Sequence, residues 1–232
     1  MIKIRPGKDR GQTKIGWLNA RHTFSFGRYH DEDQMGFRSL RVINQDRVSG
    51  GGGFPTHGHS DMEIITYVLD GGIGHEDSLG QKSVLKPGGV QIISAGTGVT
   101  HSEFNHSKTD VLHLLQMWVE PDELGLKPGY AEKTFPVDQE HGKLHLVGSK
   151  DGRDGSLLIH QDVSLYAAKL KTGDALDYKL KHNRHAWIHL ASGEISMNDV
   201  NLTSGDGAAV GEESELQIEA GSAADLVLFD LA

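Results

Sequence analysis

The chain contains no cysteine, and this absence limits its chemistry at once. With no Cys among 232 residues, disulfides and thiolate ligands or nucleophiles are excluded, so any bound metal must be held by nitrogen and oxygen atoms. No apolar run approaches the roughly 18 residues that a membrane-spanning helix needs. The opening sequence MIKIRP also lacks the apolar run of a signal peptide. We therefore expect a cytoplasmic protein without membrane contact.

The chain has fewer basic than acidic residues. Lys and Arg together number 23 and Asp and Glu number 32, which gives a net charge of −9 with neutral histidine. Nucleic-acid-binding surfaces need clustered cations, so direct binding to nucleic acid is not expected.

Short apolar or alternating runs recur about every ten residues and are separated by glycine-containing turns. This rhythm, with no long helical periodicity, predicts an all-β sandwich or barrel. The runs lie at 40–43, 62–69, 90–93, 111–119, 143–147, 157–160, 165–170, 186–190, 194–197, 216–219 and 226–231.

The rhythm is interrupted between Pro121 and Pro136, where prolines and glycines replace the apolar pairs. We interpret this stretch as a crossover between two β units, with a turn of helix at Pro121–Glu123. The predicted domains are residues 1–135 and 136–232.

Two short motifs carry side chains that bind metals. His57 and His59 form one pair at positions i and i+2, and His101 and Glu103 form another. Residues two apart on a strand point to the same face, so each pair directs two donor groups into one space. A closed sheet that brought the pairs together would assemble three imidazoles and one carboxylate. These donors suit Fe(II), Mn(II), Ni(II), Cu(II) or Zn(II), and an octahedral metal would keep two open positions.

Both motifs resemble those of the cupins, which are small metal-binding β-barrels. The first motif runs from Gly51 through His57, His59 and Glu63 to Gly71, one residue longer than the usual pattern. The second motif has Gly96 where cupins usually have proline.

The chain resembles one cupin subgroup, the pirins, more closely. The similarity is dense over residues 16–120 and weaker in the remaining half, where it rests mainly on Asp154–Ser156 and His160–Asp162. The matching segments are Arg21–Gly27, Met35–Phe37, Leu40–Asn44, Gly53–His59, Asp61–Glu63, His75–Ser78 and Ser94–Glu103.

The resemblance implies a bicupin, meaning two jelly-roll barrels in one chain, of which the N-terminal barrel holds a single metal. It places the ligands on His57, His59, His101 and Glu103, with Fe(II) as the expected metal. Ordinary cupins use the carboxylate of the first motif, so Glu63 stays open as an alternative or supporting ligand. In the C-terminal barrel we expect no metal ligands, and a monomer is expected because the barrels would cover each other.

The resemblance also implies an activity, the O₂-dependent cleavage of the flavonol quercetin by a quercetin 2,3-dioxygenase. A flavonol hydroxyl must lose its proton to react, and a metal lowers the pKa of a hydroxyl bound to it. Glu103 is the expected catalytic residue, which either accepts that proton or neutralises the ion.

Other histidines are weaker candidates. His22 is expected either at the mouth of the metal pocket or as a hydrogen-bonded turn residue. His113 is expected either inside the barrel near the metal or outside it, and His75–Asp77 is expected to be a solvated loop. The spacing of His182, His185 and His189 suits a helix in a segment with strand character, so we expect surface or packing roles.

Two other functions stay open. A regulatory protein that senses metal or redox state would act through a protein partner without turnover. A metal-dependent isomerase acting on a small acidic metabolite would need a local basic patch, for which Arg21, Arg38 and Arg41 are the N-terminal candidates.

Overall fold

The computed structural model describes all residues from Met1 to Ala232 and consists of β-strands joined by turns. Its only helical segments are three 3-10 turns, η1 (Gly7–Asp9), η2 (Pro136–Asp138) and η3 (Arg153–Gly155). The prediction of an all-β protein is confirmed. No helix combines the length and the apolar character that crossing a membrane would require.

The chain folds into two compact units. The N-terminal unit comprises Gly11–Phe135 together with Leu157–Gln161. The C-terminal unit comprises Met1–Arg10, Pro136–Ser156 and Asp162–Ala232. Each unit thus includes a short segment from the opposite half of the sequence, and the domain limits 1–135 and 136–232 stay a prediction.

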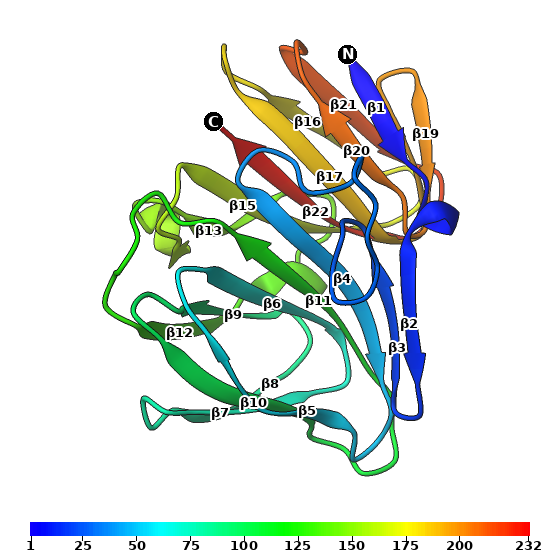
Figure 1. Cartoon of the computed structure of the whole chain (residues 1–232). Coiled ribbons are helices and arrows are strands. Elements are labelled where there is room, and N and C mark those ends of the chain that lie inside the picture. The colour runs from blue at the N-terminus through cyan, green and yellow to red at the C-terminus, as the bar shows by residue number, and fades with distance from the viewer. The chain divides into compact units, whose positions relative to one another are not determined.

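The N-terminal unit has two antiparallel sheets (Figure 1). The large sheet has the order β12-β9-β6-β11-β4-β3-β2 and the small sheet the order β5-β10-β7-β8. The large sheet contains β2 (Gly11–Ile15), β3 (Leu18–His22), β4 (Leu40–Val48), β6 (Glu63–Asp70), β9 (Gly89–Ser94), β11 (Leu112–Val119) and β12 (Gly129–Thr134). The small sheet contains β5 (Gly53–His59), β7 (Ile73–Asp77), β8 (Lys82–Leu85) and β10 (Val99–Asn105). The two-residue strand β14 (Leu157–Leu158) also belongs to this unit.

The C-terminal unit repeats this arrangement. Its large sheet includes the order β1-β20-β17-β22-β15-β13, and its small sheet has the order β16-β21-β18-β19. The strands are β1 (Ile2–Arg5), β13 (His145–Ser149), β15 (Val163–Leu170), β16 (Ala175–Lys179), β17 (His185–Ser192), β18 (Glu194–Met197), β19 (Val200–Thr203), β20 (Gly207–Val210), β21 (Glu215–Ala220) and β22 (Ala224–Leu231). Aliphatic side chains from both sheets, such as Leu176, Ile188, Ile218 and Leu228, form its buried core.

Two local predictions within the stretch from Pro121 to Pro136 are wrong. Pro121–Glu123 has no helical turn, and Gly129–Thr134, which lies inside the predicted crossover, is strand β12. This strand lies at the edge of the large sheet and pairs with β9 alone. Because most of its side chains are exposed, its sequence carries little of the hydrophobic signal that marks inner strands.

Gly96 explains why the second motif departs from the usual cupin proline. Its φ is +45°, and a Cβ atom there would lie 2.0 Å from the carbonyl oxygen of Leu126. Proline requires a φ near −65° and cannot adopt this conformation. The close approach lets the amide of Thr97 donate a hydrogen bond of 2.8 Å to the same carbonyl. Glycine at position 96 therefore shapes the turn that leads into β10.

Gly96→Ala should lower the free energy of unfolding by about 2–4 kcal/mol, since it combines a positive φ with a main-chain clash. Urea unfolding followed by tryptophan fluorescence measures the change. Gly129→Ala is the control, because a Cβ there meets nothing within 4 Å, and its expected effect is within about 0.5 kcal/mol. Equal losses in the two variants would show that the Gly96 turn is not the cause.

Candidate metal centre

Pairing between β5 and β10 brings three imidazoles together. His57 lies opposite His101, and His59 lies opposite Val99. The ring centroids are 4.7 Å apart for His57–His59, 4.5 Å for His57–His101 and 5.1 Å for His59–His101. One ring nitrogen from each histidine falls within 4.8 Å of the others. The structure therefore brings together the three histidines that the sequence singled out.

The pairing of β10 with β5 is interrupted by a β-bulge between His101 and Glu103. His101 pairs with His57, but Glu103 pairs with Phe54, so β5 has one more residue than β10 in this interval. Bulges redirect side chains and occur often beside active sites. The extra residue in β5 lets His57 face His101 while β10 keeps its regular alternation.

Pairing between β10 and β7 forms a second cluster on the same strand. Glu103 lies opposite His75, and His101 lies opposite Asp77. Donor atoms of His75, His101 and Glu103 fall within 4.8 Å of one another. His101 thus belongs to both clusters. Glu103 is grouped with His75 and His101.

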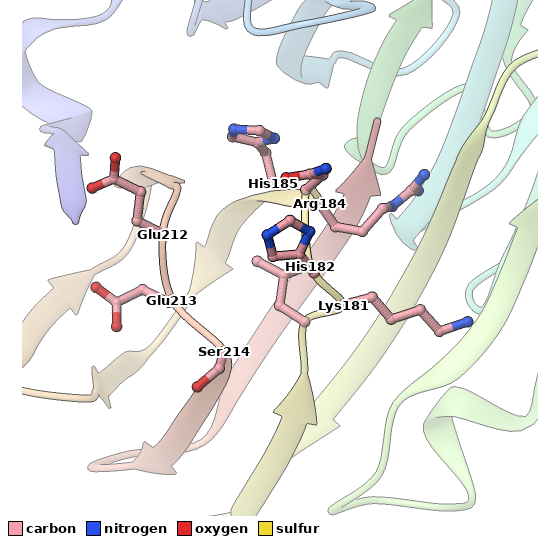
Figure 2. Close-up of a pocket in the computed structure, with 9 residues that line it drawn as sticks. Lys181, His182, Arg184, His185, Glu212, Glu213 and Ser214 are labelled. Atoms are coloured by element: carbon pink, nitrogen blue, oxygen red, sulfur yellow. The ribbon is translucent and has the colours of Figure 1, made fainter.

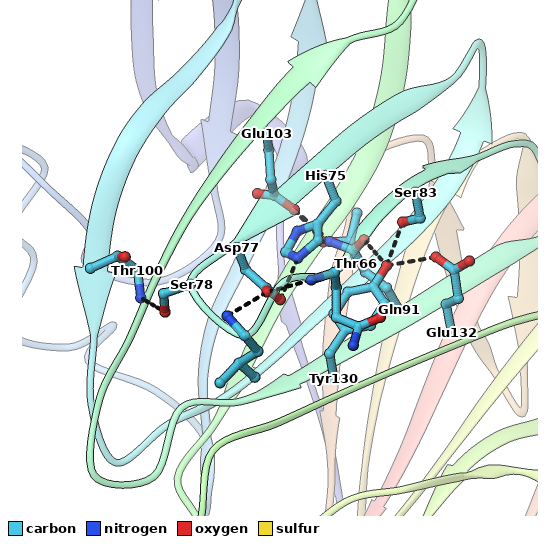
Figure 3. A network of polar contacts seen from close by, with 12 residues as sticks. Thr66, His75, Asp77, Ser78, Ser83, Gln91, Thr100, Glu103, Tyr130 and Glu132 are labelled. Carbon is cyan, nitrogen blue, oxygen red and sulfur yellow. Dashed lines mark hydrogen bonds and ion pairs between the residues drawn. The ribbon is translucent and has the colours of Figure 1, made fainter.

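The carboxylate of Glu103 is buried and held by neutral donors (Figure 3). Gln91 Nε2 donates to Oε1 at 2.5 Å, Thr66 Oγ1 to Oε1 at 3.4 Å, and Gln116 Nε2 to Oε2 at 2.8 Å. Thr66 is paired with Gln116 on one side and with Gln91 on the other, so one polar row crosses three strands of the large sheet. This row fixes the orientation of the carboxylate.

Burial raises the pKa of Glu103, although the charges of His75 and His57 and the amide hydrogen bonds oppose the shift. A second buried carboxyl, Asp46 on β4, behaves similarly. Burial, and next the charge of Glu103, raise the pKa of Asp46 to about 7. Near neutral pH, Asp46 therefore carries less negative charge than it would in water.

The histidines are suited to donate lone pairs. Burial and the neighbouring imidazoles lower the pKa of His101 to about 3, and burial and His57 lower that of His59 to about 4. Both rings are therefore neutral at neutral pH, which is the form that binds metals.

The unpaired ring nitrogens fit a metal ion. Nδ1 and Nε2 of His101 and Nε2 of His59 are buried and have no hydrogen-bond partner. His57 Nδ1 donates to the carbonyl oxygen of Pro55 at 2.8 Å, which leaves the lone pair on Nε2. Buried nitrogens without partners are costly, and a divalent cation bound among them would supply the missing interaction.

Glu63 lies on the other face of the large sheet from this cluster. Its Oε2 accepts hydrogen bonds from Ser94 Oγ at 3.0 Å and from the main-chain amide of His160 at 3.2 Å, with His160 Nδ1 also at 3.2 Å. Its neighbour on the strand, Ile64, alternates with it and faces the opposite side. The carboxylate is thus engaged in joining the segment Leu157–Gln161 to the rest of the N-terminal unit.

His22 and His113 also have partners of their own. His22 contacts Asn44 Oδ1 at 2.7 Å and Thr13 Oγ1 at 2.9 Å. His113 lies 3.0 Å from Gln45 Nε2 and alternates with core residues of β11. Neither joins the two donor clusters.

The expectation for His75–Asp77 is wrong. These residues are part of β7, and the side chains of His75 and Asp77 are fully shielded from solvent and contact each other. The signal was available, because His75 and Asp77 are spaced at i and i+2 like the other two pairs.

The C-terminal histidines lie in a different setting. His182 and His185 line a cleft of about 430 Å³ together with Arg184, Glu212 and Glu213 (Figure 2), whereas His189 is buried in β17. The three do not form a cluster of metal donors.

A cleft of about 370 Å³ in the N-terminal unit is connected to the three-histidine cluster through one residue, Trp118. Trp118 lines it, and the Trp118 ring meets the His59 ring edge to face with centroids 5.0 Å apart. Phe26 packs against Trp118 with centroids 5.3 Å apart, and Met35 and Met62 complete an apolar wall. Arg41 contributes a positive charge at the same cleft.

Comparison with known proteins follows this geometry. Residues 4–119 match the family model described as Pirin, and residues 146–231 match the model described as Quercetinase C-terminal cupin domain. The chain is 45% identical over 231 residues to a quercetin 2,3-dioxygenase of Escherichia coli K12, covering 100% of this chain and 99% of the relative. It is 40% identical over 233 residues to a pirin-like protein of Caulobacter vibrioides, covering both chains completely.

Solved structures agree. A bacterial pirin from Escherichia coli in complex with nickel(II) superposes with a TM-score of 0.94 at 44% identity, covering 100% of this chain and 99% of that one. The expected two-cupin architecture is confirmed by this likeness and by the two family matches. The chain therefore belongs to the pirin family.

Proposed function

We propose that this protein is a metal-dependent dioxygenase of the quercetin 2,3-dioxygenase type. The observation that carries the proposal is the convergence of three imidazoles, two of which have unpaired buried nitrogens. Trp118, which contacts the His59 ring, also lines an aromatic cleft. The quercetin 2,3-dioxygenase name of a relative 45% identical over the whole chain gives independent support.

In this proposal His57, His59, His101 and Glu103 hold one divalent transition metal. Three nitrogens and one oxygen suit several first-row ions, and the nickel(II) complex of the E. coli pirin supports a divalent ion. Fe(II) is our proposed physiological metal. A monomeric state and a cytoplasmic location also stay predictions.

The cleft lined by Phe26 and Trp118 is the proposed substrate site. Phe26 and Trp118 offer aromatic faces and edges to a flat ring system, and the methionines adapt to its outline. A cleft of about 370 Å³ lies in the range of small-molecule sites. Arg41 favours a substrate that carries phenolic oxygens with partial or full negative charge.

Glu103 is the proposed proton acceptor. A carboxylate offers about four acceptor positions, and Thr66, Gln91 and Gln116 occupy three of those on Glu103. The remaining capacity is available to the metal or to a proton. A proton acceptor must lie within hydrogen-bond reach of the hydroxyl, and the Glu103 carboxylate lies beside His101, with a donor atom of each residue within 4.8 Å of the other. A metal bound beside it lowers the pKa of a coordinated hydroxyl and supplies the redox chemistry that O₂ requires.

Reconstitution with single metals tests the proposal. Protein loaded anaerobically with Fe(II), Mn(II), Ni(II), Cu(II) or Zn(II) should bleach quercetin and consume O₂ with at least one of these metals. His101→Ala should abolish turnover and lower the metal content, because His101 is shared by both donor clusters.

The matched control is His182→Ala, which removes an exposed histidine in the C-terminal unit and should keep full activity. Stoichiometric metal binding by the wild-type protein without turnover with any metal would contradict the dioxygenase assignment. That outcome would favour a regulatory protein that acts through a protein partner.

Glu103→Gln separates proton transfer from substrate binding. The amide keeps the size of the side chain but cannot accept a proton, so kcat should fall by about 10²–10⁴-fold. The KM for quercetin should change much less. Steady-state kinetics at saturating metal measure both values. A rise in KM with unchanged kcat would show that Glu103 is not the proton acceptor.

A further inference from the structure

His75 is a buried imidazole of the N-terminal unit to which the proposed reaction assigns no role. It lies on β7 directly opposite Glu103 of β10, and the two residues occupy the same face of the sheet. Its side chain is shielded from solvent, and its Nδ1 atom has no hydrogen-bond partner. His75 therefore has one buried ring nitrogen without a partner, and one of its ring nitrogens lies within 4.8 Å of a Glu103 carboxylate oxygen.

Asp77 determines which nitrogen of His75 carries hydrogen. Asp77 Oδ2 lies 2.9 Å from His75 Nε2, and Oδ1 accepts main-chain hydrogen bonds from Leu79 at 2.8 Å and Gln81 at 3.0 Å. A carboxylate held in this way only accepts hydrogen bonds, so His75 Nε2 is the donor. In the neutral imidazole, Nδ1 is then a hydrogen-bond acceptor.

The ring of His75 is also held in its plane. Tyr130 stacks on it with centroids 4.5 Å apart and an angle of 19° between the rings. The Tyr130 hydroxyl is fixed in turn by contacts with Ser83 at 2.8 Å and Glu132 at 2.6 Å. Figure 3 shows the imidazole lying between the carboxylates of Asp77 and Glu103.

We propose that His75, oriented by Asp77, accepts a hydrogen bond at Nδ1 from the substrate hydroxyl that is bound beside His101 and Glu103. The donor atoms of His75, His101 and Glu103 lie within 4.8 Å of one another, a separation that one oxygen atom placed among them can bridge. Rings without a hydroxyl at this position lack the contact, so His75 selects hydroxylated aromatic substrates. This inference rests on the proposed function.

Asp77→Asn is the sharpest variant. The carbonyl oxygen of the introduced amide keeps the acceptor for the Leu79 and Gln81 main-chain amides, while its NH₂ group faces His75 Nε2. His75 Nε2 then becomes the acceptor and Nδ1 carries the hydrogen, so the ring stays in place but no longer accepts from the substrate. His75→Phe is the second variant, because it keeps the stacking on Tyr130 and removes both nitrogens.

The readout is binding rather than turnover. Dissociation constants for quercetin are measured anaerobically by visible absorbance on Ni(II)-loaded protein, alongside the flavone that lacks only the 3-hydroxyl. Both variants should weaken quercetin binding about tenfold, which corresponds to about one hydrogen bond. Binding of the flavone should stay unchanged, and Ni(II) affinity, measured by chelator competition, should change by less than about threefold.

Each other outcome has a distinct meaning. An equal loss for quercetin and the flavone would assign His75 a merely structural role, and a loss of Ni(II) affinity above a hundredfold would make it a metal ligand. Either result overturns the inference, as does unchanged quercetin binding in both variants. If wild-type protein loaded with Ni(II) binds neither flavonoid, the proposed function fails and the inference fails with it.

Discussion

The position of β10 between β5 and β7 is the constraint on which the site depends. Because β10 pairs with both neighbours, His101 faces His57 on one side and Asp77 on the other, and Glu103 faces His75. Side chains directly opposite each other in an antiparallel sheet are held at a nearly fixed separation. Three short strands thus bring four imidazoles and two carboxylates close together, with His75, His101 and Glu103 buried and His57 at the surface.

The cost of this arrangement is electrostatic. Each buried polar atom without a partner costs about 1–3 kcal/mol, and several ring nitrogens here have none. The protein offsets part of this cost elsewhere, since the amides of Gln91 and Gln116 bind Glu103 and the main chain at Pro55 binds His57. A divalent cation among the remaining nitrogens returns binding free energy that also stabilises the folded unit. The C-terminal unit repeats the strand order but fills its interior with aliphatic side chains, so its stability rests on hydrophobic packing instead.

The sequence was most informative where short-range spacing and strand geometry agree. The i, i+2 pairs at His57 and His101 pointed to a common interior, and the resemblance to pirins placed the same residues at a metal site. His75 was assigned to a solvated loop because the rhythm of apolar runs does not mark β7, in which a glycine, a histidine and two acids follow a single isoleucine. Strand β12 was missed for a related reason, since an exposed edge strand needs few apolar residues. The pairing partners of Glu63 and His113 depend on long-range register, which no local pattern contains.

The central claim is that one metal is bound by three imidazoles and one carboxylate. X-ray absorption spectroscopy on protein loaded with one equivalent of Ni(II), together with pulsed EPR on Cu(II)-loaded protein, counts the coordinated imidazoles directly. The account predicts three imidazole nitrogens on the metal, with oxygen ligands completing the shell, and one imidazole fewer in His59→Ala. Two or four coordinated imidazoles in the wild-type protein would contradict it.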